Sequence, residues 1–165
     1  MNFSKTNEGQ YDAIVVGSGI SGGWAAKELC EAGLKTLVLE RGRMVKHLED
    51  YPTMHKDLWD LPHGGKTPNE IVEKHYSKQK RWGFNETNRH FYNKDSDHDY
   101  DEVKPFDWIR GKQVGGRSLI WGRQTYRWSD LDFEANSKDG YGVDWPIRYK
   151  DIAPWYSHVE KFIGV

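Results

Sequence analysis

The clearest alternation of apolar and polar positions lies in the first forty residues. Residues 11–16 (YDAIVV) end in a β-branched run that stops at a glycine cluster, which predicts a buried strand. Residues 20–32 predict a helix that starts with small residues and ends before Gly33, and residues 34–39 (LKTLVL) predict a second strand. Strand, helix and strand within roughly 30 residues predict a βαβ unit with parallel strands.

Beyond residue 42 the periodicity weakens. Residues 43–104 contain many charged residues and scattered aromatic ones, interrupted by prolines and glycines. This pattern predicts irregular loops with one helix near 69–78, and no second core. So long an irregular segment is typical of a lid, a binding loop or an insertion. Order returns in residues 105–128, and an apolar stripe at helical spacing predicts a helix from about residue 151 to 163. The expected divisions are therefore 1–42, 43–104, 105–128 and 129–165.

Composition narrows the class of protein. The 165 residues suffice for one compact domain, and 24 Lys plus Arg against 25 Asp plus Glu leave a net charge of −1, which argues against a nucleic-acid partner. No apolar run reaches the roughly 18–20 residues of a membrane span, and no secretory signal is visible, so a cytoplasmic protein is expected. A single cysteine excludes an internal disulfide. Hydrophobic residues make up only 36%, which predicts a thin aliphatic core.

A glycine motif follows the first predicted strand. Gly17 permits a tight turn, Gly19 lets a pyrophosphate approach the backbone, and Gly22 lets the helix pack closely on the sheet. The free N–H groups at the start of the helix favour phosphate oxygens. Glu40 ends the second strand, where a carboxylate accepts hydrogen bonds from ribose hydroxyls and repels a 2′-phosphate. This pattern favours FAD or NAD over NADP; the alternative is a packing turn followed by a surface glutamate.

A second glycine cluster, Gly115-Gly116, follows the basic run Arg110-Gly-Lys and precedes Ser118. It offers another set of bare backbone N–H groups. A flavin is longer than one βαβ grip and has to be held along its ribityl chain and ring, so a second contact segment suits FAD. The alternative interpretation is a tight turn between elements.

With these two motifs the chain resembles the glucose-methanol-choline (GMC) oxidoreductases, FAD enzymes that oxidise alcohols and sugars. The resemblance is carried by residues 11–22 (YDAIVVGSGISG), 37–42 (LVLERG) and 110–118 (RGKQVGGRS). Residues 121–133 and 144–147, with the helix after them, are most similar to the bacterial sugar-dehydrogenase and pyranose-oxidase branch. The resemblance implies an α/β FAD-binding Rossmann-like fold of the GMC type, present as an amino-terminal piece, with a second FAD-contact segment at 105–128 and the start of a substrate domain at 129–165.

The resemblance also implies roles for particular residues. The glycine loop would hold the pyrophosphate, Glu40 the adenosine ribose, and Arg41 would lie near the adenine, while the second segment would line the flavin side. Ile120 stands where some family members carry the histidine that attaches FAD, so non-covalent FAD is expected. No catalytic residue is expected before Val165, because the family's histidine pair lies near the carboxyl end. The cofactor-binding residues expected are Gly17, Ser18, Gly19, Ile20, Ser21, Gly22, Glu40, Arg41, Val114, Gly115, Gly116 and Ser118.

The implied reaction is oxidation of a sugar or other alcohol by hydride transfer to flavin N5. The piece itself is expected to be inactive, and the expected partners are a small-molecule substrate and an electron-acceptor subunit. Export with such a partner would make the protein periplasmic. Two alternatives stay open: an NAD-dependent dehydrogenase with the same βαβ grip, and a non-catalytic FAD-binding module.

Other chemistry is less well supported by the sequence. The seven histidines show no metal-ligand spacing and are expected at the surface, so no metal site is predicted. Residues 95–101 imitate the start of a calcium loop, but Tyr100 replaces the required glycine, so a solvated acidic loop is expected. Cys30 is expected to be buried. The aromatic segment Trp121–Trp128 is equally consistent with a sugar-binding pocket and with core packing.

Overall fold

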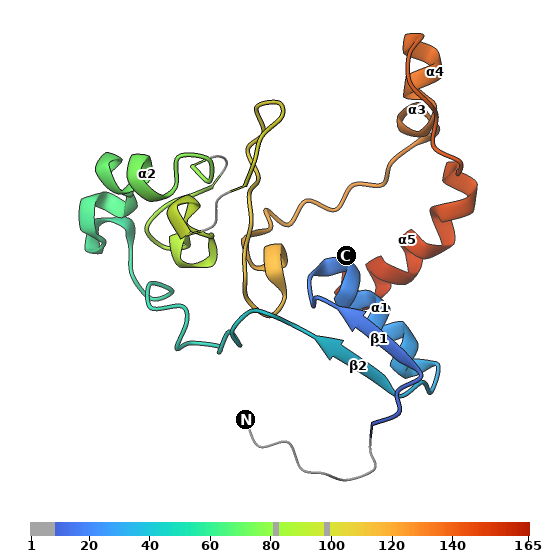
Figure 1. The fold of residues 1–165 in the computed structure, drawn as a ribbon, viewed down its shortest axis with the longest axis horizontal. Coiled ribbons are helices and arrows are strands. Elements are labelled where there is room, and N and C mark those ends of the chain that lie inside the picture. The colour runs from blue at the N-terminus through green and yellow to red at the C-terminus, as the bar shows by residue number, and fades with distance from the viewer. Residues whose placement is uncertain (1–8, 81–82, 98–99) are drawn as a thin grey trace. The chain divides into compact units, whose positions relative to one another are not determined.

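The computed structural model describes residues 9–80, 83–97 and 100–165. The chain divides into two compact units, residues 1–122 and residues 123–165, and each is described by itself. Figure 1 shows the course of the chain through both units.

The first unit opens with the predicted βαβ unit. Strand β1 (Ala13–Val16), helix α1 (Ile20–Glu31) and strand β2 (Thr36–Leu39) follow one another, and β1 pairs with β2 in parallel, with Ala13 opposite Thr36 and Val16 opposite Leu39. Gly33 follows α1 with φ of +84°, a conformation that glycine adopts without steric cost. The structure thus confirms the parallel α/β arrangement that the sequence predicts.

Only one face of this small sheet is covered. Val15 is buried beneath α1, whereas Val16, which points the other way, is 82% exposed. Helix α1 itself buries no residue fully, and Cys30 is exposed, so the prediction of a buried cysteine was wrong. The physical reason is that α1 packs against the two strands and the short helix at residues 116–120, which leaves its far side in solvent.

Residues 44–103 form short helical pieces joined by turns. Among the described residues of this segment these pieces are α2 (Asn69–His75) and the 3₁₀ helices η1 (Leu58–Asp60), η2 (Pro62–Gly65), η3 (Arg89–Phe91) and η4 (Asp95–Asp97). The helix expected near residues 69–78 is present and ends earlier, at His75.

The expectation that this segment has no core of its own was wrong. Leu61, Tyr76, Phe91 and Tyr92 are all buried there. Phe84 lies between two tyrosine rings, with ring centroids 5.0 Å from Tyr76 and 5.1 Å from Tyr92. Aromatic side chains bury enough surface for a few of them to replace a larger aliphatic core.

A buried amide ties this segment to the residues that follow it. Gln79 is fully buried, and its Nε2 donates to Oδ1 of Asp95 (2.7 Å) and to the carbonyl of Trp108 (2.9 Å). Its Oε1 accepts the backbone N–H of Arg110 (3.0 Å). The side chain therefore satisfies backbone groups that have no partner strand at this point.

The second unit is helical. It contains α3 (Asp130–Phe133), α4 (Ala135–Asp139) and α5 (Tyr149–Ile163), so the helix predicted at about 151–163 is confirmed and begins slightly earlier. Phe133 is buried, and Trp128 meets the ring of Trp145 edge-on at 6.1 Å. The Arg127 guanidinium binds Glu160, with Nε 2.7 Å from Oε1, and donates to the Tyr149 hydroxyl. Within the described ranges no helix combines the length and apolarity needed to cross a bilayer.

Replacing the buried amide tests its role. We expect Gln79→Leu to lower the free energy of unfolding by about 3 kcal/mol or more, because the substitution leaves Asp95 and two backbone groups unsatisfied. Urea denaturation measures the change. The exposed Gln10 gives the matched control, and Gln10→Leu should stay within about 0.5 kcal/mol of the parent. Similar small effects from both variants would show that the Gln79 bonds do not hold the segment.

Candidate functional site

The site is built on the loop between β1 and α1. Gly17 turns the chain with φ of +90°. A Cβ on Gly22 would lie 2.0 Å from the carbonyl oxygen of Gly17, so no larger residue fits between loop and helix. A Cβ on Gly19 would meet no protein atom within 4 Å. Gly22 is therefore required by packing, whereas Gly19 keeps the backbone open to the space outside.

The amino end of α1 is free of side-chain caps. Gly19 is its N-cap residue, and no acidic residue occupies the first turn. The first N–H groups of a helix have no partner inside the helix, and the helix dipole adds positive potential there. This end of α1 therefore suits an anion such as a phosphate.

Glu40, directly after β2, reaches back to this loop. Its Oε2 accepts the Ser18 hydroxyl (2.6 Å) and the Ser18 backbone N–H (2.8 Å), and its Oε1 accepts the N–H of Gly42 (2.7 Å). The Ser18 hydroxyl, and then the N–H groups of Gly42 and Ser18, lower the pKa of Glu40 below its ordinary value. The carboxylate is thus ionised and fixed at the tip of β2.

The second glycine segment lies directly beside the first. Arg43, after β2, bridges in parallel to Gln113, and the N–H of Val114 donates to the Arg43 carbonyl (2.9 Å). The N–H of Gly115 then donates to the Ser18 hydroxyl oxygen (3.0 Å). A Cβ on Gly116, the first residue of η5 (Gly116–Ile120), would lie 3.5 Å from the Cα of Gly19. The residues joined by the Ser18–Gly115 bond are 97 positions apart in the sequence. The two glycine motifs thus form one surface.

A second buried amide supports this segment. Gln113 is buried, and its Nε2 donates to the carbonyls of Phe91 (3.2 Å) and Gly116 (3.0 Å). Gly42 also has to be glycine here, because a Cβ would lie 2.5 Å from the Cα of Gln113. Sequence reasoning missed both residues; the only signal was their place inside the two motifs.

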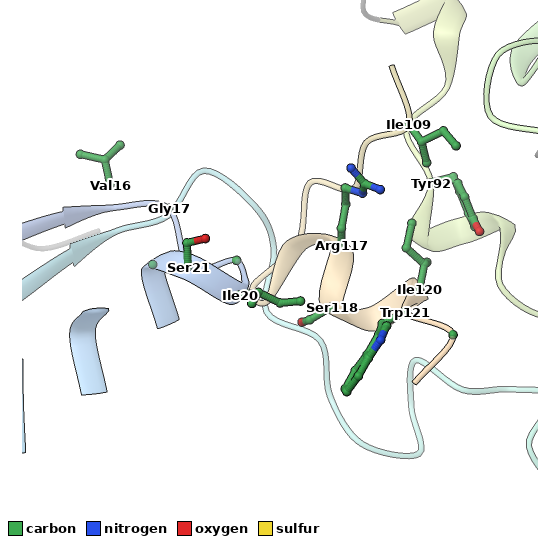
Figure 2. Close-up of a pocket in the computed structure, with 13 residues that line it drawn as sticks. Val16, Gly17, Ile20, Ser21, Tyr92, Ile109, Arg117, Ser118, Ile120 and Trp121 are labelled. Carbon is green, nitrogen blue, oxygen red and sulfur yellow. The ribbon is translucent and has the colours of Figure 1, made fainter. Parts of the chain in front are cut away.

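Two clefts open on either side of the glycine loop. One, of about 770 Å³, runs from Val16 and Ser21 past Ser118 to Trp121, with Ile109 and Tyr92 at its far end (Figure 2). The other, of about 670 Å³, is lined by β2, by Glu40 and by residues 111–113. Both clefts are lined by Val16, Gly17 and Gly19, so they meet at the glycine loop.

The structure brings most of the predicted site residues together around these clefts. The first cleft is lined by Gly17, Gly19, Ile20, Ser21, Gly22 and Ser118. The second is lined by Gly17, Ser18, Gly19, Glu40, Arg41 and Gly116. Val114 and Gly115 line neither cleft and instead fix the second segment to Arg43 and Ser18.

The clefts also contain residues that sequence reasoning did not assign. Lys112 lines the second cleft, and burial, followed by the charges of Arg41 and Arg110, lowers the pKa of its ammonium group. Tyr92, Ile109 and Arg117 line the first. In the aromatic segment, Trp121 lines the first cleft, whereas Trp128 packs within the second unit, so the core-packing interpretation holds for Trp128.

Metal-binding residues do not gather in the part of the chain that the structure describes: no three His, Cys, Asp or Glu side chains come together there. His47, His55, His63, His90 and His158 are exposed and His75 is half-buried. His98 lies outside the described residues, as does part of the acidic run 95–101. Asp95 of that run accepts hydrogen bonds from Lys78 and Gln79.

Comparison with known proteins finds relatives that include several dehydrogenases. A 2-methyl-1,2-propanediol dehydrogenase from Mycolicibacterium austroafricanum is 26% identical over 97% of this chain and 25% of its own length. The fructose dehydrogenase large subunit of Gluconobacter japonicus is 27% identical over 93% of this chain and 27% of its own. The gluconate 2-dehydrogenase flavoprotein of Pantoea cypripedii is 28% identical over 93% and 25% respectively.

These relatives are GMC-type oxidoreductases, which confirms the resemblance found in the two glycine motifs. No family model matches the chain. The chain spans about a quarter of the length of the curated relatives it matches.

Adding one methyl group tests the packing of the glycine loop. We expect Gly22→Ala to lower the free energy of unfolding by about 1–3 kcal/mol, because the loop and α1 have to separate. Gly23→Ala is the matched control on the same helix, since its Cβ would lie 3.7 Å from the nearest atom, the Ser18 carbonyl oxygen. The control should gain up to about 1 kcal/mol from helix propensity. Equal shifts of the urea midpoint would contradict the packing argument.

The Glu40 contacts predict a pH dependence. Because the pKa of Glu40 is lowered in the folded protein, its carboxylate stabilises the fold above the ordinary glutamate pKa of 4.5, and this stabilisation is lost as the pH falls through the lowered value. We expect Glu40→Gln to be less stable than the parent at pH 7 and the gap to narrow at more acidic pH. Urea titrations across this range measure it, with the exposed Glu73→Gln as control. A gap independent of pH would refute the assignment.

Proposed function

We propose that the chain binds FAD across the two clefts and forms the cofactor-binding part of an oxidoreductase that acts on CH–OH groups of sugars or other alcohols. The observation that supports this most directly is that two clefts meet at one glycine loop. A dinucleotide has the same layout, with two bulky halves joined by a diphosphate. The diphosphate would lie at Gly19 and the amino end of α1, with one half of the cofactor in each cleft.

The residues present fit such a ligand. The open backbone at Gly19 and the uncapped N–H groups of α1 suit the diphosphate oxygens. Glu40 and Arg41 line the second cleft, where the adenosine would lie. The Glu40 carboxylate can only accept hydrogen bonds, so a ribose hydroxyl would donate to it beside the Ser18 and Gly42 donors. Ser118, Ile120 and Trp121 line the first cleft, where the flavin would lie.

A bound flavin supplies hydride acceptance at N5, and the protein supplies binding, orientation and electrostatics. In this chain the glycine loop and Glu40 position the cofactor, while the apolar wall at Ile109, Ile120 and Trp121 limits water on the flavin side. We assign no proton-transfer residue among the described residues of this chain. Ile120 offers no nucleophile for attachment, which supports non-covalent FAD.

Partners of the whole enzyme are inferred from the relatives. One relative is a fructose dehydrogenase large subunit, which supports an electron-acceptor subunit here as well. Its substrate, and that of the gluconate 2-dehydrogenase, favours a sugar or sugar-derived alcohol. A cytoplasmic location, or a periplasmic one reached with the partner subunit, stays part of the proposal.

Titration with FAD tests the proposal. We expect the purified protein to bind FAD with a visible flavin spectrum and to release it intact on acid precipitation. Gly19→Ser keeps a good N-cap residue but adds a Cβ and a hydroxyl to the open side of the loop. It should weaken FAD binding by about tenfold or more, while the free energy of unfolding stays within about 1 kcal/mol of the parent.

Gly23→Ala is again the control, because Gly23 lines neither cleft and its substitution should leave FAD affinity unchanged. Saturable binding of NAD without any binding of FAD would shift the assignment to a nicotinamide-dependent dehydrogenase. Absence of binding by both would overturn the dinucleotide site itself.

A further inference from the structure

A third cavity, of about 630 Å³, lies in the first unit, among α2, η3 and the residues that follow η3. It is built mostly from residues 71–97, which contribute little to the two dinucleotide clefts. Its volume is within the roughly 300–1,000 Å³ typical of small-molecule sites. Nothing in the proposed FAD binding accounts for it.

The lining of this cavity is strongly cationic. Arg89, Lys94 and Lys112 face a single lining carboxylate, that of Asp97. Arg89 pairs through Nε with Glu86 (3.3 Å), which uses one edge of its guanidinium group. Lys94 and Lys112 form no ion pair with any carboxylate in the described ranges. The positive charge of the cavity is therefore largely uncompensated by the residues described.

A buried amide donor in the wall is also unsatisfied. Asn93 is 7% exposed, and its Nδ2 has no hydrogen-bond partner among the described residues. Its backbone N–H donates to the Arg110 carbonyl (3.0 Å), which fixes the residue in place. An unpaired buried donor costs free energy, so such groups are rare unless a ligand or water completes them.

The remaining lining combines rings with further nitrogen atoms. His90 donates from Nε2 to the Asp50 carbonyl (2.8 Å), and His75 contacts the Ser96 hydroxyl through Nδ1 (2.9 Å). Burial raises the pKa of the Tyr76 and Tyr92 hydroxyl groups, which therefore stay protonated at neutral pH. Cationic groups, an amide donor and apolar rings together favour a small molecule that carries oxygen anions.

We propose that this cavity is a binding site for an oxyanion-bearing small molecule, whose carboxylate or phosphate oxygens are held by Asn93, Lys94, Lys112 and Arg89. Lys112 also lines the cleft of Glu40 and Arg41, so the two sites are neighbours that share one side chain. The proposal does not depend on FAD binding, because Lys112 is the only one of these four groups in either dinucleotide cleft.

Titration with inorganic phosphate and with citrate, at constant ionic strength, tests the site by calorimetry. We expect saturable binding of at least one probe. Lys94→Gln should weaken this binding by about tenfold, the loss typical of one charge-assisted hydrogen bond. Lys74→Gln is the matched control, because Lys74 lies exposed on α2 and outside the cavity, and it should leave affinity unchanged.

Asn93→Leu gives a second test, in which stability and probe affinity are expected to change in opposite directions. It keeps the number and branching of the side-chain heavy atoms and removes the unsatisfied donor, so it should raise the unfolding midpoint of the ligand-free protein while weakening the binding of the probe. A merely structural asparagine would show destabilisation on the same substitution. Destabilisation with unchanged probe affinity would therefore count against the site.

The experiment has to distinguish phosphate bound at the amino end of α1 from phosphate bound in this cavity. Gly19→Ser should abolish the first and leave the second intact, and the cavity should also bind its probe when FAD is present. Loss of probe binding in Gly19→Ser, equal losses in Lys74→Gln and Lys94→Gln, or no saturable binding of phosphate or citrate would each overturn the proposal.

Discussion

The hydroxyl group of Ser18 is the contact on which the site depends. It donates to the Glu40 carboxylate and accepts the N–H of Gly115, so one side chain joins the glycine loop, the tip of β2 and the second glycine segment. The ionised carboxylate strengthens the first of these bonds, because hydrogen bonds to a charged acceptor are shorter and stronger than neutral ones. The two clefts exist because these three pieces of chain are held together at this point.

Two different roles follow for Glu40, one from the sequence and one from the structure. From the sequence it is expected to bind the ribose, and in the structure it organises the loop that would hold the diphosphate. These are compatible, since a carboxylate already held by N–H and O–H donors of the chain would lose little freedom on accepting a ligand hydroxyl. In the proposed FAD site, the same contacts would make recognition of the ribose depend on the conformation of the glycine loop. Cofactor affinity and loop geometry would then be coupled through Glu40.

The sequence predicted the parts of the fold that local pattern determines. The βαβ unit follows from a β-branched run, a glycine turn and a second apolar run. The ends of these elements are also marked in the sequence: Gly33, for example, ends the helix. The core of residues 44–103 could not be predicted in this way. It depends on pairing between aromatic rings and on the Gln79 and Gln113 amides, which bind backbone groups about 20–30 residues away. Neither contact leaves a periodic signal.

The candidate site was predicted better than its surroundings for the same reason. A dinucleotide loop requires glycine at fixed spacing, so Gly17 and Gly22 were identified from the pattern, and Gly22 indeed has no room for a Cβ. The bond between the Gly115 N–H and the Ser18 hydroxyl brings two distant segments together, and the sequence suggested this pairing only through the need of a long flavin for a second contact segment and through the family resemblance. Lys112 and Asn93 were missed because a lone lysine and a lone asparagine acquire meaning only from their surroundings in space.

The exposed side of the sheet links binding to stability. Parallel sheets are normally covered on both faces, yet Val16 is 82% exposed at the point where the two clefts meet. A dinucleotide lying there would cover part of this surface, so its binding free energy would add to the stability of the fold. Ligand at a hundred times its dissociation constant contributes about 2.7 kcal/mol in this way. For a βαβ unit with one covered face, such a contribution would be a large share of the free energy of unfolding, so the unit that forms the proposed site would itself be stabilised by the ligand.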